Sequence, residues 1–171
     1  EVFYRIENFS HMDDFFISVV SDSNHWLFIS TKGGLSAGRT DCDSALFPYY
    51  TEDKIRDQSG TTGSRTVVLV ETHDRQLLWE PFAPLHHRIY DVTRTLYKNV
   101  LGDKLIFEET NHDLNLRFTY MWATSDRYGF VKESRLENTG TTHQRLRILD
   151  GIENVLPYGV LAGTRLAAEP R

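Results

Sequence analysis

The sequence predicts an all-β protein, a large antiparallel β-sandwich, and three observations indicate this fold class. Aromatic residues form 12% of the 171 residues and cluster with β-branched residues in short runs that alternate apolar and polar side chains. This alternation is typical of strands with one buried face. Turn residues recur between the runs, and helical periodicity is nearly absent. Many short strands with few helices favour antiparallel sheets packed face to face.

Five strands are predicted in the first half of the chain. They are short runs rich in β-branched and aromatic residues, at Val2–Glu7, Phe15–Val20, Trp26–Ser30, Thr66–Glu71 and Gln76–Trp79. Between the third and the fourth lies an irregular stretch from Thr31 to Ser64, which ends in the flexible sequence DQSGTTGS. Connections this long are uncommon in compact domains and are often functional.

The second half begins with a predicted strand at Arg88–Leu96, which two predicted hairpins follow. The first, KLIFEETNHDLNLRFTY (residues 104–120), turns near Asn111 to Asp113. The second joins GFVKESRLEN (129–138) to HQRLRILDGIEN (143–154) through NTGTT, whose Asn138 and Gly140 tolerate positive φ. Along DLNLRFTYMWA, alternate residues share one face of the strand. They are Leu114, Leu116, Phe118, Tyr120 and Trp122.

One sandwich domain is expected over residues 1–156, because a chain of this length suffices for a single hydrophobic core. Residues 157–171 are predicted to begin a short helical linker after Pro157. The chain starts at Glu1 and stops at LAAEPR without an evident closing element, so we interpret it as a piece of a larger polypeptide. Targeting information is absent from this piece. A cytoplasmic location is the favoured expectation.

The composition argues against several classes of partner and site. The net charge is −5, whereas nucleic-acid binding requires a basic surface. No apolar run approaches the roughly 20 residues that a bilayer helix requires. Cys42 is the only cysteine, which excludes an internal disulfide and leaves structural zinc short of ligands. We therefore expect no metal, no cofactor, no nucleic acid and no membrane as partners.

The stretch TKGGLSAGRTDCDSALFPYY, residues 31–50, has the least ordinary composition. Its glycines lack the lysine and the strand–loop–helix setting of phosphate-binding motifs, and its DCD lacks the spacing of a calcium loop. Carbohydrate binding fits better, because planar rings stack on pyranose faces while Arg and Asp form directional hydrogen bonds to hydroxyls. The candidate contacts are Arg39, Asp41, Asp43, Tyr49, Tyr50 and Trp79. The alternative role for Phe47, Tyr49 and Trp79 is packing in the core or at a sheet edge.

Two long segments resemble a known family. They are ISTKGGLSAGRTDCDSALFPYYTEDKI (residues 29–55), with LLWEPF (77–82), and FVKESRLENTGTTHQRLRILDGIENVLP (130–157). Both are similar to the amino-terminal β-supersandwich of inverting sugar phosphorylases, which are cellobiose-phosphorylase-like, and of related glycoside hydrolases. The galactose-mutarotase-like domains belong to the same superfamily. Asn138 and Arg145 to Leu149 carry the match to the family's later strand pair.

The resemblance implies a non-catalytic domain of a carbohydrate-active enzyme, either a glycoside hydrolase or a glycosyltransferase-type phosphorylase. In such enzymes the catalytic acid lies in a separate (α/α)6 barrel, so no catalytic residue is carried over to this chain. The implied partners are carbohydrate, the downstream catalytic domain of the same polypeptide and a second subunit in a homodimer. The chain departs from the family pattern in its shorter length and in its DCD sequence.

Two other functions stay open from the residues alone. A mutarotase-like aldose epimerase would need a histidine acid and a carboxylate base. His86 or His87 would pair with Glu133 or Glu153 in that case. A stand-alone carbohydrate-binding module would use the aromatic and charged loop residues without catalysing a reaction.

Overall fold

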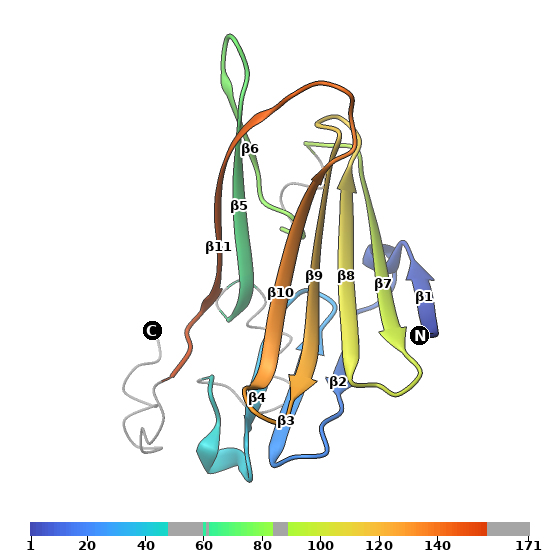
Figure 1. Ribbon diagram of the computed structural model, residues 1–171, viewed down its shortest axis with the longest axis vertical. Helices are drawn as coiled ribbons and strands as arrows, with labels where there is room; N and C mark the ends of the chain where they lie inside the picture. The colour runs from blue at the N-terminus through green and yellow to red at the C-terminus, as the bar shows by residue number, and fades with distance from the viewer. Residues whose placement is uncertain (48–59, 61, 84–88, 157–171) are drawn as a thin grey trace.

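The computed structural model describes residues 1–47, 60, 62–83 and 89–156. Within these residues, the regular structure is eleven β-strands and two short 3-10 helices (Figure 1). The strands form three sheets in which neighbouring strands run antiparallel. The predicted all-β, antiparallel, sandwich-like fold is confirmed. The tail from Pro157 onward, where a helical linker was expected, lies outside the described residues.

The largest sheet has five strands in the order β1-β7-β8-β9-β10. Their bounds are Phe3–Glu7, Val92–Asn99, Lys104–Asn111, Leu116–Ser125 and Gly129–Asn138. A second sheet has the order β2-β3-β4, with strands Phe16–Val19, His25–Ser30 and Leu35–Arg39. A third sheet has the order β11-β5-β6, with strands Arg145–Glu153, Gly63–Glu71 and Gln76–Trp79. The 3-10 helices η1 and η2 span Phe9–His11 and Cys42–Ser44.

One hydrophobic core joins the three sheets. Its buried members come from every sheet, including Leu27 of β3, Val68 of β5 and Phe107 of β8. The five alternating residues predicted to share a face of β9 and its preceding turn are all buried. At the centre, Phe107 and Tyr120 stack with ring centroids 4.8 Å apart. Each such side chain contributes about 1.5–3 kcal/mol when it leaves water, so this shared core holds the layers together.

The two predicted hairpins had different outcomes. The β8–β9 hairpin is confirmed, with Asn111 paired to Leu116 across the turn. The second hairpin prediction was wrong, because β10 pairs with β9 whereas β11 pairs with β5. The connection from 139 to 144 arches over the end of the molecule and carries the chain from one sheet to another (Figure 1). Gln144 anchors this arch by donating from Nε2 to the carbonyl of Leu114, at 2.8 Å.

The stretch expected to be irregular from Thr31 to Ser64 contains a strand and a 3-10 helix in its described part, so this expectation was partly wrong. Strand β4 escaped notice because its sequence, LSAGR, is too small and mixed to alternate clearly. Gly38 within it packs against an aromatic ring, since a Cβ there would lie 2.5 Å from Trp26. Gly33 allows the preceding turn, with a φ of 89°.

An ion pair between a nearly buried lysine and a partly exposed aspartate joins the largest sheet to the β11-β5-β6 sheet. Lys132 of β10 donates from Nζ to Oδ1 of Asp150 on β11 at 2.7 Å, and Thr66 of β5 donates to the same oxygen at 2.6 Å. The Lys132 side chain is only 8% exposed. Its ammonium also lies 5.7 Å from the centre of the Tyr120 ring. Because burial of an unpaired ammonium is costly, Asp150 compensates the charge of Lys132.

This pair predicts a pH dependence of stability. Burial raises the pKa of Asp150, but hydrogen bonds from Lys132, Thr66 and Ser134 outweigh it and bring the pKa below its ordinary 3.8. A carboxyl with a lower pKa in the folded state stabilises the protein above its unfolded pKa, and this contribution disappears as the pH falls through the folded pKa. We expect Asp150→Asn to lower the free energy of unfolding at about pH 6, and to lower it less at about pH 3.

Urea unfolding of the wild type and of Asp150→Asn at the two pH values measures this difference. Asp126→Asn, at an exposed carboxylate in the β9–β10 turn, is the matched control and should change neither value. An equal effect of Asp150→Asn at both pH values would contradict the assignment.

Candidate functional site

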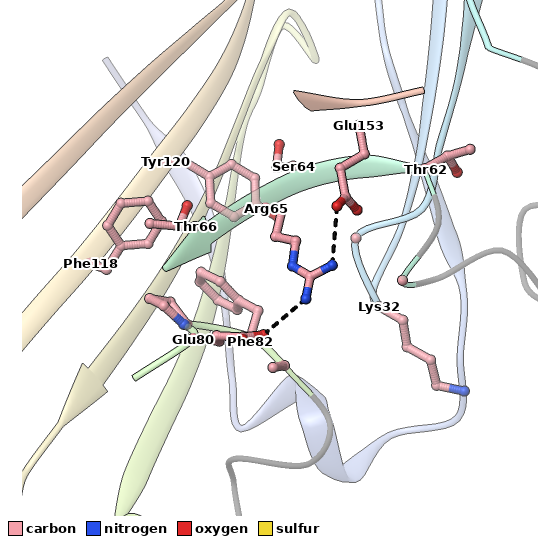
Figure 2. Close-up of a pocket in the computed structure, with 14 residues that line it drawn as sticks. Lys32, Thr62, Ser64, Arg65, Thr66, Glu80, Phe82, Phe118, Tyr120 and Glu153 are labelled. Carbon is pink, nitrogen blue, oxygen red and sulfur yellow. Dashed lines mark hydrogen bonds and ion pairs between the residues drawn. The ribbon is translucent and has the colours of Figure 1, made fainter. Parts of the chain in front are cut away.

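A pocket opens where β6 stops short of its neighbour. Strand β6 pairs only with residues 68–71 of β5, so no described strand covers that edge of Gly63–Val67. The gap forms a pocket of about 340 Å³, within the size range of small-molecule sites. Its described lining comes from the β3–β4 turn, the start of β5, the segment after β6, strand β9 and the end of β11 (Figure 2).

Aromatic rings form the apolar part of the pocket. Phe82 meets Tyr120 edge-on with centroids 5.2 Å apart, and it meets Phe118 at 6.4 Å. Tyr120 belongs to the core, and its burial raises the pKa of the phenol well above the ordinary value. Phe82 itself has a φ of 66°, which an L-residue rarely adopts. Such backbone conformations persist only where the surroundings enforce them, and they are common at binding sites.

The carboxylate of Glu109 enforces the position of Phe82. It is 1% exposed and accepts hydrogen bonds from Phe82 N at 2.7 Å and Trp79 Nε1 at 2.8 Å. Arg94 completes the set, with Nε 2.7 Å from Glu109 and Nη2 donating to the carbonyl of Ala83 at 3.2 Å. These charge-assisted bonds fix the segment from Glu80 to Ala83, which is one wall of the pocket.

Charged groups of both signs surround the opening. Arg65 of β5 lies between two carboxylates, with Nη1 3.1 Å from Glu153 of β11 and Nη2 3.6 Å from Glu80 (Figure 2). The hydrogen bond with Glu153 raises the pKa of the Arg65 guanidinium above its ordinary value. Lys32 lies across the pocket and is paired with Asp14 at 2.5 Å. Each of these two cations is therefore paired with at least one carboxylate.

Two buried hydroxyls in the lining have no hydrogen-bond partner within the part of the chain that the structure describes. They are Thr62 Oγ1 and Ser64 Oγ, and Thr62 is 4% exposed. Buried polar groups are normally satisfied, and leaving one unpaired costs about 1–3 kcal/mol. Both residues line the same pocket, so a small rotation of either side chain would present its hydroxyl to a ligand there.

Main-chain atoms form the wall beside these hydroxyls. Gly63 has a φ of 117°, and a Cβ on it would lie 2.1 Å from the carbonyl oxygen of Gly33. Only glycine allows the start of β5 to approach the β3–β4 turn this closely.

Of the residues predicted as carbohydrate contacts, the four that the structure describes do not line this pocket. Arg39, Asp41 and Asp43 lie together at the far end of β4 from the pocket, and all three are exposed. Asp41 accepts a hydrogen bond from Ser44 N at 3.1 Å and caps η2, which is a local structural role. Tyr49 and Tyr50 lie outside the described residues.

Trp79, the remaining candidate contact, is buried in this structure. Its side chain is 0% exposed and its indole N–H is bonded to Glu109, so the alternative of core packing applies to it and to the 4% exposed Phe47. For the epimerase alternative, His86 and His87 lie outside the described residues. Glu133 is exposed on β10, whereas Glu153 is bonded to Arg65 at the pocket.

No family model matches this sequence, and a search of curated proteins finds no significant match. Among the described residues, no group of three or more His, Cys, Asp or Glu side chains could hold a metal ion. In the same part of the chain, no helix has the length and apolar character that crossing a membrane requires. Function is therefore inferred from the pocket residues themselves.

The hydrogen bonds of Glu109 with Trp79, Phe82 and Arg94 predict a large loss of stability when the negative charge of Glu109 is removed. Glu109→Gln keeps the shape of the side chain but leaves the Arg94 guanidinium buried without a counter-charge. We expect the free energy of unfolding to fall by about 3–5 kcal/mol. Urea denaturation measures the loss.

Two further variants make this experiment specific. Adding Arg94→Met to Glu109→Gln removes the uncompensated charge, so the double variant should be more stable than Glu109→Gln alone. Glu7→Gln breaks the exposed Arg5–Glu7 pair and should leave the unfolding midpoint unchanged. A loss at Glu109 no larger than at Glu7 would contradict the role given to this carboxylate.

Proposed function

We propose that this chain is a non-catalytic β-sandwich domain of a carbohydrate-active enzyme, a glycoside hydrolase or phosphorylase, and that the pocket beside β5 contacts carbohydrate. In this proposal the domain packs against a downstream (α/α)6 catalytic barrel of the same polypeptide. The resemblance of two long segments to sugar-phosphorylase sandwiches supports the class of protein. The observation that supports a carbohydrate ligand is the pair of buried hydroxyls, Thr62 and Ser64, which have no hydrogen-bond partner among the described residues and lie beside an aromatic wall.

A neutral sugar fits the chemistry of this pocket. Pyranoses present an apolar face and a ring of hydroxyls, and the lining offers aromatic edges on one side and hydroxyl, carboxylate and guanidinium groups on the other. Arg65 is compensated by Glu80 and Glu153, and Lys32 is compensated by Asp14. A phosphate or carboxylate ligand would meet these carboxylates, which disfavour a second negative charge.

The same ion pairs support a non-catalytic role. Glycoside hydrolysis requires two carboxyl groups, one of which holds a proton and serves as the general acid. Glu80 and Glu153 are instead both engaged in ion pairs with the Arg65 guanidinium. We therefore expect the isolated chain to bind sugar without cleaving or phosphorolysing a glycoside.

Removing the hydroxyls of Thr62 and Ser64 should weaken sugar binding without lowering the stability of the fold. Thr62→Val with Ser64→Ala deletes groups that make no hydrogen bond in the described protein, so the free energy of unfolding should stay the same or rise. Each hydroxyl that a sugar uses contributes about 1 kcal/mol, so the dissociation constant should rise roughly tenfold or more. Calorimetric titration with glucose, galactose, cellobiose and maltose measures the change.

Thr72→Val is the matched control, because its hydroxyl donates to the carbonyl of Arg75 in a turn outside the pocket. That variant should lose stability while keeping sugar affinity. The absence of binding heat with all four sugars, or equal affinity in the double variant and the wild type, would refute carbohydrate contact at this pocket. Turnover of a glycoside by the isolated chain would refute the non-catalytic assignment.

A further inference from the structure

Strand β11 is an open edge of its sheet. Among the described residues only β5 pairs with it, in an unbroken register from Arg145 opposite Glu71 to Glu153 opposite Gly63. Natural edge strands are commonly kept short, bulged, interrupted by proline or given an inward-pointing charge. Strand β11 has nine residues with no proline and no bulge, and its inward charge, Asp150, is already compensated by Lys132. Its outer edge is therefore competent to pair with another strand.

Large apolar side chains are exposed along this strand. Leu149 is 72% exposed on the outer face of the sheet, and Ile148 is 52% exposed on the inner face. Ile152 is exposed as well, on the same face as Ile148. Exposed apolar groups concentrated on an unpaired edge are a feature of strand-docking sites.

We infer that β11 pairs antiparallel with β11 of a second copy of this chain. The two strands would be related by a two-fold axis at Leu149, so that the β11-β5-β6 sheets of two subunits form one continuous sheet. Glu153 at the end of β11 also lines the pocket, but the inference is argued from the edge of β11 and does not depend on the proposed function.

The sequence of β11 is complementary to itself in this arrangement. With Leu149 opposite Leu149 of the second copy, Arg145 comes opposite Glu153 of the second copy at both ends of the pairing. Arg147 comes opposite Gly151, which leaves space for the long side chain. Opposite charges directly across a strand pair are favourable, and apolar pairs are favourable as well. Every outward residue thus meets a compatible neighbour.

The neighbouring registers are less favourable than the one centred on Leu149. On the inner face of that register, Leu146 meets Ile152 of the second copy, and Ile148 meets Asp150, whose carboxylate is bonded to Lys132. Moving the two-fold axis by one residue shifts each cross-strand pair by two residues, which keeps every side chain on its own face. A shift of the pairing by one residue would reverse the faces. A two-fold axis at Asp150 would place two aspartates opposite each other, and an axis at Arg147 would place two arginines together, both of which are unfavourable. An axis at Ile148 would lose the direct Arg145–Glu153 pairs.

Sedimentation velocity of the full 171-residue chain over a wide range of concentrations tests the inference. The wild type should shift with concentration from a mass of 19.8 kDa to twice that mass, because one strand per subunit forms a small interface. Leu149→Lys places two ammonium groups opposite each other on the two-fold axis and should give only monomer. Leu78→Lys, at an exposed leucine on the other edge strand of the same sheet, should leave the dimer intact.

A charge exchange identifies the register. Arg145→Glu alone would place a carboxylate opposite the native Glu153 at both ends of the pairing. Glu153→Lys alone would place an ammonium opposite the native Arg145 at both ends. Each variant should therefore be monomeric, whereas an equal mixture of the two should form a heterodimer, because both cross-strand pairs again join opposite charges. Far-UV circular dichroism establishes that each variant is folded.

Three results would overturn the inference. The first is a wild type that stays monomeric at every concentration. The second is a Leu149→Lys variant that dimerises as tightly as Leu78→Lys, which would place the contact on another surface. The third is an equal mixture of the two charge variants that forms no heterodimer although each variant is folded.

Discussion

The buried carboxylate of Glu109 is the interaction on which the arrangement of the pocket depends. It lies on β8 of the largest sheet, yet it bonds to Trp79 at the end of β6 and to the backbone of Phe82 beyond it. Burial of a carboxylate is unfavourable unless several donors compensate it. Here an indole, a peptide N–H and the Arg94 guanidinium do so together. The requirement to satisfy this charge therefore determines where β6 ends and how the chain turns after it.

The early end of β6 in turn exposes the edge of β5. A longer β6 would continue to pair with Val67 and Arg65 and would fill the space that the pocket occupies. Instead, the Arg65 side chain reaches toward Glu80 and Glu153, which belong to different parts of the chain. The pocket thus combines residues from separate sheets, and the common core keeps those sheets at a fixed distance. This is the usual construction of a ligand site on a rigid β scaffold.

Much of the strand content could be predicted from the sequence, because alternation reports directly on burial. It succeeded best for β8 and β9, where the apolar face is continuous. It failed for the pairing of β10 and β11, since two strands separated by a turn-like segment look the same whether they join one sheet or two. Apart from Trp79, the candidate contacts were sought within one unusual loop, whereas the pocket residues Arg65, Glu80 and Glu153 are far apart in the sequence. One available signal was missed: in LIFEETN, Glu109 occupies an inward position between apolar residues, and an inward charge requires partners.

The close approach of Gly63 to Gly33 gives part of the pocket a boundary made of peptide groups. The dimensions of that boundary depend on two residues that lack side chains, and they are insensitive to exchanges among the surrounding residues. The rim residues are under no such restriction. Exchanges at the rim would therefore alter the chemistry of the pocket while this part of its outline stayed the same.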